Sequence, residues 1–107
     1  MVLKYDQITP TTPAPGITRR ILASGGKMMG VEAAFEKGAV GSVHTHPHEQ
    51  ISYILSGCFE YEENGVKYIL KAGDSYYVEP EVPHGAVALE DNSVILDIFT
   101  PQRDDFL

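Results

Sequence analysis

Hydrophobic and polar side chains alternate with a period of two along much of this chain, and no long stretch carries the helical period of about 3.6 residues. Turn residues interrupt the alternation about every eight to twelve positions. Asn64-Gly65 predicts a tight hairpin, because both central positions of such a turn favour positive φ. Short strands at this spacing predict an all-β domain, an antiparallel sandwich or barrel. The predicted strands are "ITRRILA", "MMGVEAAF", "ISYIL", the two halves of "CFEYEENGVKYIL", "SYYVE", "GAVAL" and "SVILDIFT".

The start of the chain differs from the rest, because "TPTTPAPG" at residues 9–16 contains three prolines. Proline favours extended backbone, so we expect residues 1–16 to form an extended N-terminal arm. Residues 17–107 are then expected to form one compact domain, since a chain of 107 residues is too short for two.

Composition and charge narrow the possible functions. The chain is 43% hydrophobic and 21% charged, which is typical of globular proteins, and its apolar runs are too short to cross a membrane. A net charge of −7 and scattered basic residues, of which only Arg19 and Arg20 are adjacent, argue against nucleic-acid binding. The start shows no signal peptide, and the single cysteine, Cys58, is expected to be a buried strand residue. We therefore expect a cytoplasmic protein without disulfides.

The run "HTHPHEQ", residues 44–50, is the strongest candidate for a functional site. On a strand, side chains two residues apart point to the same face, so His44 and His46 are expected to face together, and Gln50 has the same parity. Pro47 interrupts the strand, because it lacks an N–H group, and the direction of His48 is left open. Imidazole nitrogens bind divalent transition metals, so these residues predict a metal site.

One more ligand should come from another strand, and His84 in "EPEVPHG" is the only histidine left. We expect one divalent transition metal, and this ligand set suits Zn, Ni, Fe or Mn. Neutral imidazoles and an amide oxygen leave the charge of the ion uncompensated, which favours an anionic small-molecule substrate.

Two segments resemble the motifs of the cupin superfamily. "GAVGSVHTHPHEQISYILSG", residues 38–57, is similar to the first motif, and "GDSYYVEPEVPHG", residues 73–85, is similar to the second. The resemblance implies a single-domain jelly-roll barrel with a metal inside, held by His44, His46, Gln50 and His84. Gln50 replaces the usual glutamate of the first motif, and Ala88 stands where the second often has asparagine.

"HTHPHEQ" together with the tail "DIFTPQRDDFL" is most similar to the KdgF-type cupins of pectin and alginate breakdown. That resemblance implies conversion of 4,5-unsaturated monouronates to linear 5-keto sugar acids. Alternation in the last strand places Asp97 on one face with Ile95 and Phe99, and an inward Asp97 beside the metal explains this pattern. The resemblance implies that Asp97 is the acid/base and that Phe99 and Arg103 line the pocket.

Two other functions remain open, namely another small-molecule cupin such as a metal dioxygenase, and a sugar-binding or regulatory module without turnover.

The alternation along the strands also leaves two outward apolar rows, Ile51-Tyr53-Leu55 and Val94-Leu96-Ile98. Large apolar rows are seldom left in water, so we expect a homodimer, the alternative being a second layer of the same sandwich.

Overall fold

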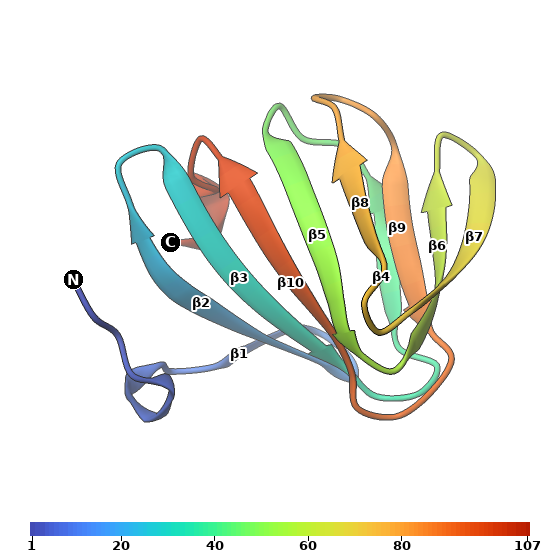
Figure 1. Cartoon of the computed structure of the whole chain (residues 1–107), viewed down its shortest axis with the longest axis horizontal. Helices are drawn as coiled ribbons and strands as arrows, with labels where there is room; N and C mark the ends of the chain where they lie inside the picture. The colour runs from blue at the N-terminus through green and yellow to red at the C-terminus, as the bar shows by residue number, and fades with distance from the viewer.

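Two antiparallel β-sheets face each other in the computed structural model, which covers residues 1–107 (Figure 1). The six-stranded sheet has the order β1-β2-β3-β10-β5-β8, and the four-stranded sheet has the order β4-β9-β6-β7. The strands of the larger sheet are β1 (Thr11–Ala14), β2 (Ile17–Gly25), β3 (Met28–Phe35), β10 (Ser93–Thr100), β5 (Glu49–Ser56) and β8 (Ser75–Val78). Those of the smaller are β4 (Val40–His44), β9 (His84–Ala88), β6 (Cys58–Glu63) and β7 (Val66–Lys71). This arrangement confirms the predicted all-β jelly roll.

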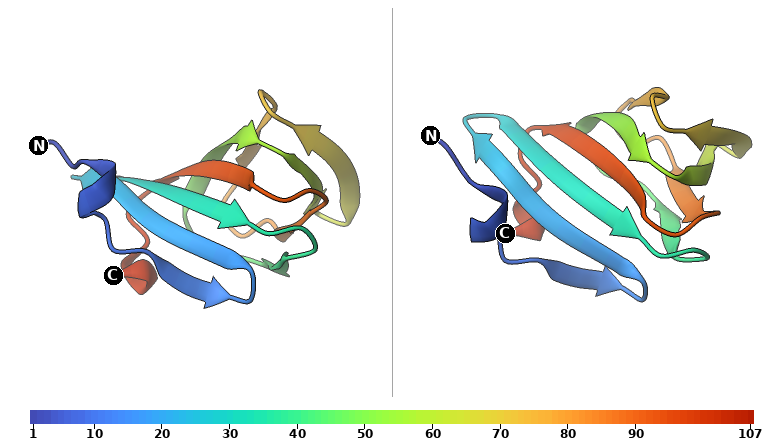
Figure 2. Two further views of the ribbon diagram at one scale, coloured as in Figure 1. Left: turned by 90° about the horizontal axis from the view of Figure 1, so that it is seen from below. Right: turned by 60° about the horizontal axis from the view of Figure 1, so that its bottom comes forward.

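Two 3-10 turns complete the chain, η1 (Tyr5–Gln7) and η2 (Asp104–Phe106), and both lie at the same end of the molecule (Figure 2). No helix is long or apolar enough to span a bilayer. The N-terminal segment expected to be an arm contributes β1, which pairs with β2 at the edge of the larger sheet.

The predicted hairpin is confirmed. Asn64 and Gly65 both have positive φ, 51° and 82°, and β6 and β7 pair on either side of them. Cys58 begins β6 and is buried as a free thiol, as expected from its position in an apolar strand.

Alternation in β5 follows the predicted parity. Gln50, Ser52 and Ile54 are buried between the sheets, whereas Ile51, Tyr53 and Leu55 are 43–56% exposed on the outside. The second predicted row differs, because Val94, Leu96 and Ile98 are only half-exposed on β10, which lies between β3 and β5. The side chains of both neighbouring strands screen the β10 row, so of the two rows only the one on β5 is exposed.

The apolar core fills one end of the space between the sheets. Phe35 and Phe59 meet edge-to-face there, with ring centroids 5.1 Å apart, and Ile54 and Ile95 pack against them. Further along the same strands the inward positions become polar, at Gln50 on β5 and Asp97 on β10. The core therefore holds the two sheets together and leaves, at the other end, a cavity with apolar walls into which a few polar side chains point.

Candidate metal centre

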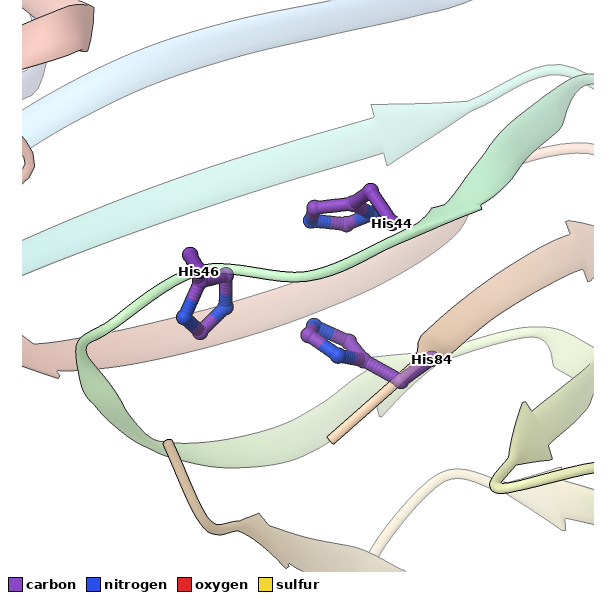
Figure 3. A group of neighbouring side chains, drawn as sticks. All are labelled: His44, His46 and His84. Atoms are coloured by element: carbon purple, nitrogen blue, oxygen red, sulfur yellow. The ribbon is translucent and has the colours of Figure 1, made fainter. Parts of the chain in front are cut away.

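Three histidines converge in this cavity, each offering one nitrogen within 4.8 Å of the others (Figure 3). His44 is the last residue of β4, and His84 is the first residue of β9, directly paired with it. Gly85 allows β9 to approach β4 this closely, because a Cβ at that position would lie 2.7 Å from the carbonyl oxygen of Gly41. His46 and His84 are buried, whereas His44 is exposed.

The route by which His46 reaches the cluster differs from the sequence prediction. His44 and His46 were expected to share a face of one strand, but β4 ends at His44 and His46 lies in the turn that follows. Pro47 cannot donate a ladder hydrogen bond, which is consistent with the strand ending before it. The two rings still converge, with centroids 5.6 Å apart, because the turn carries His46 back over the cavity.

A backbone carbonyl fixes the tautomer of each histidine. A carbonyl oxygen can only accept a hydrogen bond, so each Nδ1 carries the proton and each Nε2 keeps a free lone pair. Ligating histidines in metalloproteins are held in the same way. The Nδ1 groups of His44, His46 and His84 donate to the carbonyl oxygens of Ser42 (2.9 Å), His48 (3.0 Å) and Val82 (2.9 Å).

Gln50 places a further possible donor atom beside the three histidines. Its Oε1 lies 2.8 Å from Nε2 of His46, although both atoms are acceptors. Two acceptors at this distance repel each other unless His46 gains a second proton or a cation lies beside both. Burial lowers the pKa of His46, which disfavours the second proton. This arrangement fits a divalent metal ion held by His44, His46, His84 and Gln50.

The amide of Gln50 also explains why this position is not a glutamate. Its Nε2 group donates to Ser52 Oγ at 2.8 Å and to Asp97 Oδ1 at 3.2 Å. The Ser52 hydroxyl donates to the same Asp97 oxygen. A glutamate would have no N–H to offer and would face Asp97 with a second negative charge.

Asp97 points into the cavity, as its alternation with Ile95 and Phe99 predicted. Burial raises the pKa of Asp97 to about 6, against the opposing effect of the hydrogen bonds from Ser52 and Gln50. A carboxyl group with this pKa exchanges protons near neutral pH, as a general acid/base must.

Phe99 and Arg103 line the same cavity as His44, His84 and Asp97. Phe99 is 2% exposed and packs edge-on against His46, so it holds one histidine of the cluster in place. Arg103 is also buried, and its guanidinium donates two hydrogen bonds, of 3.0 and 2.8 Å, to the carboxylate of Asp105.

His48, whose direction the sequence left open, lies outside the metal cluster. Its Nε2 is 3.2 Å from the carbonyl oxygen of Gln102, and its Nδ1 is buried without a partner.

Sequence reasoning missed two residues of the site, Ser52 and Arg19. Both lie on inward-facing positions, Ser52 with Gln50 on β5 and Arg19 with Ile17 on β2, so the alternation could have revealed them.

The cavity has a volume of about 160 Å³, which is small even for a small-molecule site.

A family model for the cupin domain matches residues 31–99. The chain is a cupin. It is 45% identical over 93 residues to the pectin degradation protein KdgF of Dickeya dadantii (strain 3937). The matched region covers 86% of this chain and 84% of that protein. The cupin thus belongs with the KdgF-type proteins that its motifs and tail resemble.

Solved structures agree with this assignment. The structure of KdgF from Halomonas sp. is 40% identical and superposes with a TM-score of 0.94, covering 100% of this cupin and 98% of that chain. An RmlC-like cupin from Shewanella frigidimarina NCIMB 400 is 38% identical, with a TM-score of 0.93 and coverage of 99% and 95%.

Replacing Gln50 with glutamate should preserve metal binding but disturb Asp97. The new carboxylate removes the N–H donor to Asp97 and adds a like charge, so the pKa of Asp97 should rise. We expect this pKa, followed by NMR titration of the carboxyl group, to rise by about one unit. Gln102→Glu, at a position outside the cluster, is the control. An unchanged pKa of Asp97 in a metal-loaded Gln50→Glu protein would show that the amide has no influence on Asp97.

Proposed function

We propose that this cupin is a metal-dependent enzyme that converts 4,5-unsaturated monouronates to linear 5-keto sugar acids. The observation that supports this most directly is the position of Asp97, which is hydrogen-bonded to Gln50, a member of the metal-ligand set. A binding module has no need of an ionisable group with a raised pKa at that position. The similarity to KdgF of D. dadantii, which is named for pectin degradation, suggests the substrate class.

The reaction is an isomerisation and needs neither an oxidant nor a reductant. The proton of the anomeric hydroxyl leaves, the bond between C1 and the ring oxygen breaks, and C1 becomes an aldehyde. The enolate released at C5 then takes a proton at C4 and becomes a ketone. One proton therefore moves from O1 to C4 overall, and a single carboxyl group can take it and return it.

The protein's own residues have separate tasks in this scheme. Asp97 accepts and returns the proton, while Ser52 and Gln50 hold its carboxylate in place. Phe99 keeps water away from one side of the site and supports His46. A bound divalent ion would supply Lewis-acid polarisation of the substrate oxygens.

Following the ultraviolet absorbance of a polysaccharide-lyase product tests this function. The 4,5-double bond is conjugated with the carboxylate and absorbs, whereas the 5-keto product does not. We expect metal-loaded protein to remove the absorbance of the unsaturated monouronate without consuming oxygen, and chelated protein to leave it unchanged. Oxygen uptake coupled to substrate loss would instead indicate a dioxygenase.

The exposed apolar row on β5 supports a homodimer. Ile51 is 56% exposed and lies beside Tyr53, Leu55 and, on the neighbouring strand, Tyr77. We expect Ile51→Glu to shift the protein toward monomer in light scattering at micromolar concentration, because a buried charge disfavours an apolar interface. Ile69→Glu, on the outer face of β7 and equally exposed, is the control. A native monomer at that concentration would contradict the dimer.

A further inference from the structure

Arg19 occupies an inward position on β2, where a cation without a partner is unfavourable. Its neighbours of the same parity are apolar, since Ile17 belongs to the buried core and Ile21 packs against the cluster around Phe99. The adjacent Arg20 faces outward and lies 3.7 Å from a carboxylate oxygen of Glu32. The two arginines therefore lie on opposite faces of the sheet, and only Arg19 lines the metal cavity.

No carboxylate of the protein is in contact with Arg19. It makes no ion pair and no side-chain hydrogen bond, and its Nε is buried without a partner. Burial and, second, the charge of Arg103 lower the pKa of Arg19, and the charge of Asp105 opposes this change. A guanidinium keeps its charge regardless, so Arg19 presents to the cavity a positive charge that no carboxylate contacts.

Arg103 lies on the same wall and is close to Arg19. Both guanidinium carbons lie near the ring of Phe106, Arg19 at 3.8 Å and Arg103 at 4.2 Å from its centroid. The carboxylate of Asp105 accepts hydrogen bonds from the Nε and one terminal nitrogen of Arg103, and the charges of Asp97 and Arg103 also attract each other. Arg103 therefore has carboxylate partners, whereas Arg19 makes no ion pair. The guanidinium of Arg19 is thus the cation on this wall that suits an anionic ligand.

We propose that Arg19 binds the carboxylate of the substrate and thereby selects sugar acids over neutral sugars. The proposal rests on the proposed function, which supplies the class of substrate. A guanidinium presents paired N–H donors that match the two oxygens of a carboxylate. The carboxylate would satisfy the unpaired cation, while Asp97 and the histidine cluster remain free for the rest of the sugar.

Binding of three related sugars tests the proposal. D-Galacturonate is a saturated monouronate that cannot react, its methyl ester lacks the charge, and D-galactose lacks the carboxyl group. Their affinities can be measured by NMR titration of metal-loaded wild-type protein and of Arg19→Gln, Arg19→Lys and Arg20→Gln. Arg20→Gln is the matched control, since it changes the neighbouring arginine on the outer face. Elemental analysis should show equal metal content in all four proteins.

Arg19→Gln should weaken galacturonate binding about 10- to 100-fold and leave binding of the ester and of galactose unchanged. Arg19→Lys should recover part of the loss, because it keeps the charge without the paired donors. Arg20→Gln should bind all three sugars like the wild type. For the unsaturated monouronate, Arg19→Gln should raise KM more than it lowers kcat.

Three results would overturn the role of Arg19. Equal weakening for galacturonate and its ester would show that Arg19 only packs against Phe106. Unchanged galacturonate affinity in Arg19→Gln, or no binding by the wild type, would show that the carboxylate does not bind there. The proposed function fails separately, if the wild type does not convert the unsaturated monouronate; Arg19-dependent binding of galacturonate would still support the carboxylate site. Arg19→Lys provides the comparison if Arg19→Gln does not fold.

Discussion

Replacing Asp97 with asparagine should lower turnover of the unsaturated monouronate about 10²- to 10⁴-fold. Asparagine has nearly the same shape, and its carbonyl oxygen can still accept hydrogen bonds from Ser52 and Gln50. It cannot take the proton from the anomeric hydroxyl or return one to C4. The loss should therefore fall on kcat, while metal content and galacturonate affinity stay close to those of the wild type.

Absorbance of the 4,5-double bond measures the rate, and elemental analysis measures the metal. Asp6→Asn is a suitable control, because Asp6 is an exposed carboxylate in η1. Near-normal turnover in metal-loaded Asp97→Asn protein would remove the acid/base role from Asp97. The remaining explanations would then be catalysis through the metal alone or, if the wild type is also inactive, a sugar-binding module.

Replacing His84 with alanine should abolish stable metal binding and reduce turnover to background. His84 is 3% exposed, and it is the only member of the histidine cluster on β9, so no other histidine of that strand can replace it. Even the loss of an outer partner of a metal ligand typically lowers affinity about 10- to 100-fold, and the loss of a ligand should exceed that range. Burial lowers the pKa of His84 to about 4, so no proton competes with the metal for its Nε2 at pH 7.

His48→Ala provides the matched control for this variant. His48 belongs to the same histidine-rich run but is outside the cluster, and its backbone carbonyl, which accepts from His46, remains in the alanine variant. Metal titration of the two proteins should therefore give a large loss for His84→Ala and near wild-type affinity for His48→Ala. Equal loss in both, or full metal content in His84→Ala, would show that the ligand set is wrong.

The sequence determined the strands and the direction of most side chains on them. A period of two, broken by glycine, proline and asparagine, is a local property of the chain, so β3, β10 and the hairpin at Asn64-Gly65 could be located directly. The same alternation placed Gln50 and Asp97 inside the barrel. The two cupin motifs supplied His84 as the ligand from a distant strand.

The tertiary structure decided which inward residues meet. Gln50 and Asp97 are 47 positions apart and touch only because β10 lies beside β5, a strand order that alternation cannot specify. The turn after β4 carries His46 into the cluster and leaves His48 outside it, since strand parity no longer applies beyond the end of a strand. The absence of a partner for Arg19 is likewise a property of the folded protein, because it depends on every side chain that packs around the cavity.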